Sequence, residues 1–246
     1  MRGERLDQAL VSRGLCESRE KAQRAILAGL AKINGQKAAK SSQKVRSEDV
    51  VELAQGEKYV SRGGFKLEKA LSHFNLDVRG AVAADLGAST GGFTDCLLQN
   101  GAARVYAIDV GKGQLAWKLR QHPQVVVMEQ TNARELGAGH LPERMDLIVI
   151  DCSFISLRKI LPAAVAIIRP GGKIVALVKP QFEAGKAEAD RGAGVITDPV
   201  IHQRVLSELE SFVAGQTGWH WRGQVESPLL GPAGNKEFLV LIEIEG

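Results

Sequence analysis

The fold is decided by one stretch, Ala81-Val-Ala-Ala-Asp85-Leu-Gly87-Ala-Ser89-Thr-Gly91-Gly92-Phe93. An apolar run typical of a β-strand ends at an acidic residue, a glycine-rich turn follows at once, and a run typical of a helix comes next. This order of elements holds nucleotide-type ligands at the mouth of a parallel sheet. The stretch therefore predicts a ligand site at a strand-to-helix turn, and a plain β–α turn is the alternative.

The spacing of the glycines indicates the kind of ligand. A dinucleotide-binding turn has the pattern Gly-x-Gly-x-x-Gly, but Ser89 stands here at the second glycine position, which disfavours a hydride-transfer enzyme. The pattern Asp-x-Gly-x-x-x-Gly-Gly fits a ligand without a pyrophosphate, such as S-adenosylmethionine (SAM). The cofactor-binding residues predicted in this turn are Asp85, Gly87, Ser89, Gly91, Gly92 and Phe93.

Further strand-like runs follow, and polar residues stand at or near their ends. The runs are Arg104–Asp109, Val125–Glu129, Met145–Asp151 and Lys173–Lys179. We expect Asp109 to accept hydrogen bonds from the ribose hydroxyls of the cofactor, and a solvated carboxylate is the alternative. Asn132 either forms hydrogen bonds with the edge of the adenine ring or stabilises a turn.

The five apolar runs alternate with helical segments, which predicts an α/β fold with a doubly wound, Rossmann-like parallel sheet. The runs are nearly continuous in Val, Ile, Leu and Ala, as in strands covered on both faces. Ligands of such sheets bind beyond the carboxyl ends of the strands, so we expect Asp85, Asp109, Asp151 and Lys179 to meet at one edge.

The C-terminal part adds a helix and a strand to this plan. Asp198-Pro199 is a typical helix start. Trp219 and Trp221 either stack a base or pack at the core edge. The run Glu237–Glu243 predicts a last strand that is antiparallel to its neighbour.

The composition is that of a globular protein, with 246 residues, 44% hydrophobic and 24% charged. We expect one large core and a small additional module. No apolar run approaches the roughly 18 residues of a membrane span, and the N-terminus does not read as a signal sequence. Three cysteines without paired spacing and five histidines without ligand spacing predict a cytoplasmic protein with neither a disulfide framework nor a metal site.

The positive charge is concentrated at the N-terminus. Residues 1–56 carry 11 Lys and Arg against 7 Asp and Glu, whereas the remaining residues carry 21 of each kind. A small basic module on a neutral body indicates a domain that docks a polyanion. The basic residues expected to contact phosphates are Arg5, Arg19, Lys21, Arg24 and Lys37. A solvated helix face is the alternative.

The pattern of this N-terminal module predicts a small α+β fold. A helical stripe begins near Leu6, and Ser18 is a typical N-cap of a second helix. Asn34-Gly35 predicts a tight turn, and the run Val50–Leu53 predicts a closing strand. The module resembles the RNA-binding domain of ribosomal protein S-four type, also called alpha-L. The resemblance rests on Arg5-Leu6-Asp7, Ser18-Arg19, Ala22, the span Ile26 to Gly29, and Ile33-Asn34-Gly35.

The whole chain resembles the TlyA family of rRNA ribose 2′-O-methyltransferases, historically labelled hemolysin A, which have an FtsJ-like catalytic domain. The motifs that carry the resemblance are Val60 to Glu68, Asp85 to Phe93, Asp109 to Leu115, Asp151 to Ser156, Lys179 to Glu183, and Asn235 to Glu237. The resemblance implies an RNA-binding domain over residues 1–57, a linker over 58–64 and a methyltransferase domain over 65–246. It also implies SAM as cofactor and rRNA or ribosomal subunits as partners, with cytidine as the target.

The resemblance further assigns a catalytic tetrad of Lys66, Asp151, Lys179 and Glu237. A ribose hydroxyl is a poor nucleophile, so the enzyme must position it, remove its proton and stabilise the alkoxide. Lys179 would activate the hydroxyl and Asp151 would orient Lys179, while Lys66 and Glu237 would hold the ribose. Asp151 is also expected to contact the cofactor. A structural ion-pair network is the alternative.

Four other functions can be compared with the residues. An amino-group methyltransferase would carry two prolines after the fourth strand, and Asp151-Cys152-Ser153-Phe154 has none. Cys152 lacks the companion motif of a carbon-5 cytosine methyltransferase, and a small buried thiol is the better interpretation. A pore-forming toxin finds no support in a chain without a signal sequence or membrane span, and a non-catalytic RNA-binding factor remains an alternative.

Overall fold

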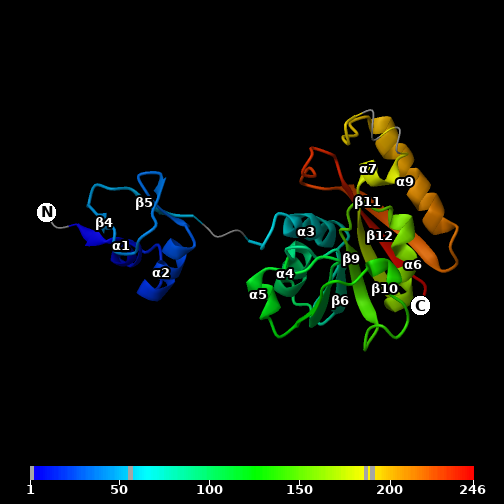
Figure 1. Ribbon diagram of the computed structural model, residues 1–246, viewed down its shortest axis with the longest axis horizontal. Coiled ribbons are helices and arrows are strands. Elements are labelled where there is room, and N and C mark those ends of the chain that lie inside the picture. Colours follow the sequence, from blue (N-terminus) through cyan, green and yellow to red (C-terminus); the bar gives the residue numbers. More distant parts are fainter. Residues whose placement is uncertain (1–2, 55–57, 186–187, 189–191) are drawn as a thin grey trace. The chain divides into compact units, whose positions relative to one another are not determined.

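The computed structural model describes residues 3–54, 58–185, 188 and 192–246. The chain divides into two compact units, Met1–Lys58 and Tyr59–Gly246, which are called here the N-terminal unit and the C-terminal unit (Figure 1). In the described part of the chain, no helix is long and apolar enough to cross a membrane.

The N-terminal unit contains two helices and short strands, which confirms the predicted α+β character. Its elements are β1 (Glu4–Arg5), α1 (Leu6–Ser12), α2 (Arg19–Leu27), β2 (Ala31–Ile33), β3 (Gln36–Lys37), β4 (Lys44–Val45) and β5 (Val51–Leu53). Strand β1 pairs with β4, and a second sheet has the order β3-β2-β5. The two helices and the strands enclose a core that includes Leu6, Leu10, Ala22, Ile26, Ala31 and Val45.

Local sequence signals account for the boundaries of these elements. The Ser18 side chain accepts a hydrogen bond from the Lys21 amide, as an N-cap does, and α2 follows. Asn34 and Gly35 have φ angles of 51° and 79° and join β2 to β3. Positive φ at both positions is the signature of a type I′ hairpin turn, which the Asn-Gly pair predicts.

The C-terminal unit is built on a seven-stranded sheet of order β11-β12-β10-β9-β6-β7-β8. The strands are β6 (Val82–Leu86), β7 (Arg104–Ile108), β8 (Val125–Met128), β9 (Met145–Ile150), β10 (Ile168–Val178), β11 (Trp219–Glu226) and β12 (Phe238–Ile244). Strands β6 to β10 are parallel, and β12 is antiparallel to both β10 and β11. The five predicted parallel strands and the antiparallel last strand are confirmed.

Helices cover both faces of this sheet (Figure 1). The helical elements are α3 (Gly63–His73), α4 (Gly92–Gln99), α5 (Trp117–Arg120), η1 (Ala133–Glu135), η2 (Leu157–Lys159), α6 (Leu161–Ile167), α7 (Pro180–Glu183) and α9 (Pro199–Ala214). Helices α3 and α4 pack on one face through a cluster that contains Leu67, Phe93 and Leu97, and α6 and α9 pack on the other through a cluster that contains Leu161 and Leu209. Burial on both faces is why the parallel strands read as continuous apolar runs.

The strand order places a topological switch point between β6 and β9. The chain runs from β6 outward to β7 and β8, and then returns to place β9 on the other side of β6. Loops leave β6 and β9 in opposite directions at this point, so a crevice opens beyond the carboxyl ends of the two strands. Gly87 and Asp151 follow these strands directly.

The C-terminal segment holds one element that the sequence did not predict, the edge strand β11. Trp219 and Trp221 lie on it, half-buried, and pack against the core that α6 and α9 cover, so the packing interpretation of these rings is the one the structure shows. The helix predicted from Asp198-Pro199 is present as α9, and the Asp198 side chain accepts a hydrogen bond from the Val200 amide.

Candidate active site

The glycine turn between β6 and α4 depends on close backbone packing. Gly87 has φ 86°, and a Cβ atom there would lie 2.8 Å from the Asp151 carbonyl oxygen. Gly91 has φ 97° and caps α4, and a Cβ atom there would lie 2.3 Å from a methyl group of Leu119. Both positions favour glycine because their φ angles are positive, and at Gly87 a side chain would also collide with the backbone of Asp151.

Two adjoining cavities lie at the carboxyl edge of the sheet. The first has a volume of about 350 Å³ and is lined by residues that include Lys66, Asp85, Gly92, Phe93, Lys179 and Glu237. The second has a volume of about 520 Å³ and is lined by residues that include Asp109 and Asn132. Both cavities share Gly87, Ser89, Asp151 and Ser153, so they adjoin one another at the glycine turn. Of the predicted cofactor residues, Gly91 lines neither cavity but shapes the turn.

Asp109 braces the glycine turn. Its Oδ2 accepts a hydrogen bond of 2.8 Å from the Ser89 amide, and its Oδ1 accepts one of 2.7 Å from the Gly111 amide. Ser89 itself has φ 48°, which is uncommon for a residue other than glycine, so the bond to Asp109 helps to hold the turn in this conformation. Each carboxylate oxygen keeps a second acceptor site for a ligand hydroxyl.

The Asn132 side chain forms local hydrogen bonds that stabilise the turn into η1. Its Oδ1 accepts a hydrogen bond of 3.1 Å from the Arg134 amide, and its Nδ2 donates one of 2.8 Å to Glu135. It caps η1 and lines the second cavity together with Asp109. The adenine-edge role stays a prediction.

Asp85 is a buried carboxylate with only one of its oxygens satisfied. Asp85 is 1% exposed, and its Oδ2 accepts hydrogen bonds of 2.9 and 2.7 Å from the amide and the hydroxyl of Thr94. Among the described residues, the buried Oδ1 atom has no partner. Burial raises the pKa of Asp85 to about 7, the negative charges of Asp151 and Asp109 add to this rise, and the bonds from Thr94 oppose it.

The four residues of the predicted tetrad come together in the first cavity as two lysine–carboxylate pairs. Lys66 on α3 donates to Glu237 at 2.5 Å, across 171 residues of sequence. Lys179, which follows β10, lies 2.6 Å from Asp151, which follows β9. The Lys179 ammonium also donates to the Ser153 hydroxyl at 2.8 Å. Sequence reasoning did not assign Ser153, although it lies two residues beyond Asp151 in the same motif.

The loop before β12 positions Glu237. Asn235 is 1% exposed, accepts a hydrogen bond of 2.8 Å from the Ile196 amide and donates one of 2.9 Å to the Gly194 carbonyl. Gly231 leaves room for the carboxylate, because a Cβ atom there would lie 2.6 Å from Glu237 Oε1. Asn235 therefore acts as an anchor for the loop that carries Glu237, a role that the sequence alone did not assign.

Four of the basic residues predicted to contact phosphates form ion pairs within the N-terminal unit, namely Arg5, Arg19, Lys21 and Arg24. Arg5 donates to both carboxylate oxygens of Asp7, at 3.0 and 3.1 Å, and Arg19 donates to Oδ2 at 2.9 Å. Asp7 is 0% exposed, and the hydrogen bond from Arg5 is the main cause that holds the pKa of its carboxyl well below the usual range. Lys21 pairs with Glu17 and Arg24 with Glu20, one helical turn away in each case.

These contacts separate the predicted phosphate-binding residues into two groups. Arg5 and Arg19 hold a buried carboxylate, which the sequence did not reveal, and Arg19 still has 52% of its side chain exposed. Lys21, Arg24 and Lys37 are exposed and carry no buried partner in the described unit. Their phosphate contacts stay a prediction.

No group of three or more His, Cys, Asp or Glu side chains in the described ranges could hold a metal ion. The unpartnered oxygen of Asp85, the glycine turn and the acceptors of Asp109 fit a ligand that has an ammonium group at one end and ribose hydroxyls at the other, as SAM does.

A doubly wound sheet with a glycine turn at its switch point, and with lysine–carboxylate pairs beside that turn, defines a methyltransferase of the SAM-dependent class. The chain belongs to the FtsJ-like methyltransferase family, which matches residues 59–243, and it carries an S4 domain over residues 4–51.

Relatives and solved structures agree with this assignment. The chain is 48% identical to the YqxC protein of Bacillus subtilis over 99% of its own length and 86% of the relative's. It is 45% identical to the 16S/23S rRNA (cytidine-2′-O)-methyltransferase TlyA of Mycobacterium tuberculosis, over 98% of this chain and 90% of that protein. A solved structure of a Streptococcus thermophilus protein that carries the hemolysin name is 45% identical, with a TM-score of 0.74, and covers 100% of this chain and 90% of its own.

Proposed function

We propose that this protein transfers a methyl group from SAM to a ribose 2′-hydroxyl of rRNA, with cytidine as the target nucleotide. The relative from Mycobacterium tuberculosis carries this activity in its name and is 45% identical over nearly the whole chain. The observation that carries the proposal is the pairing of Lys179 with Asp151 and of Lys66 with Glu237 in one cavity beside the glycine turn.

Lys179 is the residue that activates the hydroxyl in this proposal. An ammonium group has three hydrogens, and Lys179 directs two of them to Asp151 and Ser153. The third can hold the ribose 2′-oxygen and stabilise the negative charge that develops on it. When Lys179 is neutral, the same nitrogen can accept the hydroxyl proton, and Asp151 then keeps the nitrogen aimed at that oxygen.

Lys66 and Glu237 line the same cavity as Lys179. Their side chains are 11% and 1% exposed, so the pair is almost fully withdrawn from water. A buried pair of this kind keeps a fixed geometry because breaking it would leave an uncompensated charge. We assign to it the holding of the target ribose, with Lys66 donating and Glu237 accepting hydrogen bonds.

SAM supplies an electrophilic methyl group on a sulfonium sulfur. The residues that would hold it fall on both cavities. Asp85 Oδ1 is free to accept from the ammonium of its methionine part, and Asp109 can accept from its ribose hydroxyls. Asp151 lines both cavities, so we assign to it a contact with the cofactor in addition to the orientation of Lys179. Together these residues align the methyl group and the 2′-oxygen for an in-line displacement.

We assign the docking of RNA to residues 1–57 and catalysis to residues 65–246, in the cytoplasm where ribosomes are made. Phosphate groups are recognised by exposed Lys and Arg side chains, and such contacts make affinity depend on salt. The N-terminal unit offers Lys21, Arg24 and Lys37 on its surface, with part of Arg19.

Methylation of a base carbon through a cysteine is not supported by the site. Burial raises the pKa of the Cys152 thiol to about 12, and the charge of Asp151 adds to this rise. A thiol with such a pKa is not a nucleophile at neutral pH.

A nucleoside analysis tests the proposed function. The rRNA or ribosomal subunits are incubated with the protein and SAM, digested, and analysed by mass spectrometry. We expect 2′-O-methylcytidine; a product methylated on the base, or no product, would refute the proposal.

A further inference from the structure

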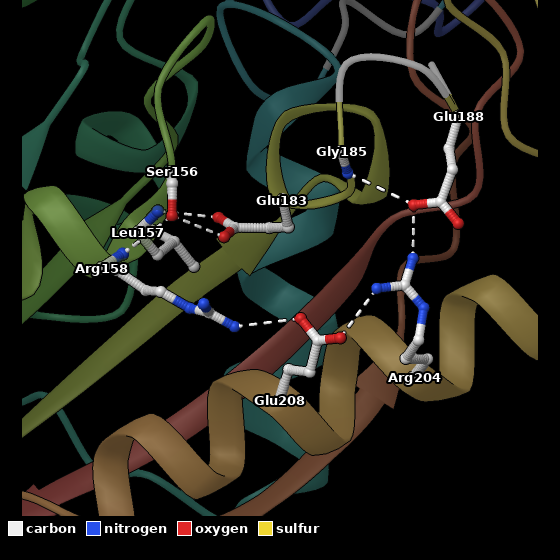
Figure 2. Close-up of polar contacts among 8 residues, drawn as sticks. All are labelled: Ser156, Leu157, Arg158, Glu183, Gly185, Glu188, Arg204 and Glu208. Atoms are coloured by element: carbon white, nitrogen blue, oxygen red, sulfur yellow. Dashed lines mark hydrogen bonds and ion pairs between the residues drawn. The ribbon is translucent and has the colours of Figure 1, made fainter.

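Two segments of the active site are joined at both of their ends. One is the loop of residues 151–157 after β9, and the other is residues 179–183, formed by Lys179 and α7. Lys179 binds Asp151 and Ser153 at one end of this junction. At the other end Glu183, the last residue of α7, reaches the far part of the same loop (Figure 2).

Glu183 makes two short hydrogen bonds there. Its Oε2 accepts from the Ser156 hydroxyl at 2.7 Å, and its Oε1 accepts from the Leu157 amide at 2.7 Å. Figure 2 shows the carboxylate directed at these two donors and away from the charged side chains on α9. Burial raises the pKa of the Glu183 carboxyl, and the bonds from Leu157 and Ser156 oppose that rise. The half-buried carboxylate of Glu183 therefore holds the loop of residues 151–157 through both of its oxygens.

The loop between the two attachment points needs such support. Phe154 has φ 62°, in the left-handed region that residues other than glycine and asparagine rarely adopt, and it is 90% exposed. A strained residue persists only where the surroundings over-determine its conformation. Burial does not hold Phe154 in this conformation. The residues on either side of it are held by hydrogen bonds, Ser153 to Lys179 and Ser156 to Glu183.

We propose that Glu183 is a positioning residue for methyl transfer: it clamps the loop of residues 151–157 against α7, and so keeps Ser153 and Asp151 in place to aim the Lys179 ammonium. This inference rests on the proposed function, because Lys179 is the group whose position matters. Glu183 touches neither of the two cavities, so its effect on the reaction passes through the loop.

A neighbouring set of charges provides a matched control. Glu208 on α9 binds Arg158 at 3.2 Å and Arg204 at 2.7 Å, and Arg204 also pairs with Glu188 (Figure 2). The side chains of Arg158, Arg204 and Glu208 are each 41% exposed, and exposed pairs contribute little. Glu208→Ala removes a carboxylate of the same type from the adjacent network without releasing Ser156 or the Leu157 amide.

The experiment compares Glu183→Ala, Glu183→Asp, Glu183→Gln and Glu208→Ala with the unchanged chain. Rates of methyl transfer to rRNA give kcat and the KM for RNA, and calorimetry gives the affinity for SAM. Competitive acetylation with acetic anhydride, read by mass spectrometry, reports the reactivity of Lys179 without any turnover. Lys66, which belongs to the other ion pair in the same cavity, serves as the internal reference.

We expect Glu183→Ala and Glu183→Asp to lower kcat by about 10- to 100-fold, as displaced catalytic groups do, with the KM for RNA and the SAM affinity unchanged. Acetylation of Lys179 should rise several-fold while that of Lys66 does not change. Glu183→Gln should keep most of the rate, because its amide oxygen can accept from the Leu157 amide and Ser156 can accept from its NH₂ group. Glu208→Ala should behave like the unchanged chain.

Normal kcat and normal Lys179 acetylation in folded Glu183→Ala or Glu183→Asp would overturn the clamp. A Gln variant as slow as the Ala variant would also overturn it, because charge and not the two hydrogen bonds would then carry the effect. If the unchanged chain transfers no methyl group, the proposed function is wrong. In that case a selective rise in Lys179 acetylation still upholds the clamp, and unchanged acetylation still refutes it.

Discussion

Asp85→Asn should make the C-terminal unit more stable and its cofactor binding weaker. The pKa of Asp85 is about 7 in the folded chain, against 3.8 for the unperturbed carboxyl. The unfolded chain therefore loses this proton at lower pH than the folded chain, and stability falls as the pH rises from about 4 to about 7. At about 1.36 kcal/mol per pH unit the total loss is roughly 4 kcal/mol.

The asparagine keeps the contacts that the structure shows. Both bonds from Thr94 go to the same oxygen, Oδ2, so one amide oxygen can accept them both. The substitution removes only the charge and places an NH₂ group at the position of the unpartnered Oδ1. Because the penalty for the charge grows with pH, the stability advantage of the variant should increase by about 2 to 3 kcal/mol between pH 5 and pH 8.

Urea unfolding followed by tryptophan fluorescence measures this advantage. Trp117, Trp219 and Trp221 are the three tryptophans of the chain, and all lie within Tyr59–Gly246, so the signal reports the C-terminal unit alone. Calorimetry on the same protein should show SAM binding weakened by about 1.5 to 3 kcal/mol, the range for a hydrogen bond to a charged group. A stability difference that does not change with pH, or a variant that binds SAM normally, would refute this account of Asp85.

The other predictions concern the reaction, the cofactor and the RNA. Lys179→Ala should lower the methyl-transfer rate by about 10²- to 10⁴-fold while calorimetry shows nearly unchanged SAM affinity, and a rate above about a tenth of normal would rule out its role. Asp109→Ala should weaken SAM binding by about 1–3 kcal/mol in a folded protein, and an unchanged dissociation constant would contradict the assignment to ribose. Replacing Lys21, Arg24 and Lys37 together by alanine should lower the salt slope of RNA binding by about two to three, and parallel salt titrations would mean that these side chains are only solvated.

The parts of the fold that the sequence predicts are those set by local backbone chemistry. Asn34-Gly35 specifies a turn with two positive φ angles, and Asp198-Pro199 specifies a helix start. The stretch Ala81–Phe93 specifies a strand, a turn and a helix, because glycine is needed where φ is positive and another backbone passes close by. Each of these signals lies within a few residues, so a single sequence is enough to find it.

Strand β11 shows why an edge strand escapes this kind of reasoning. Among the described strands it pairs only with β12, and its sequence, Trp219 to Glu226, contains few apolar residues because its side chains are at most partly buried. Gly223 has φ 143°, and the register of β11 against β12 shifts between Trp221 and Gly223. A bulge of this kind interrupts the period of two that would have marked a strand.

Side-chain partners that are distant in sequence are the second limit. Lys66 and Glu237 are 171 residues apart, and only the resemblance to a known family placed them together. The sequence marks Asp7 only as part of the Arg5-Leu6-Asp7 motif, whereas folding buries its carboxylate, which Arg5 and Arg19 bind. The hydrogen bonds of Glu183 to Leu157 and Ser156 likewise span 26 and 27 residues, and no local sequence pattern predicts them.

The central claim is that a ribose 2′-hydroxyl, held beside Lys179, is the atom that accepts the methyl group. The most direct test uses two RNAs that differ only at the mapped target nucleotide, one with ribose and one with 2′-deoxyribose, together with radiolabelled SAM. The account predicts full methyl transfer to the first RNA and none to the second, with equal binding of both. Methyl transfer that continues on the 2′-deoxy RNA would contradict it, because the acceptor would then be the base.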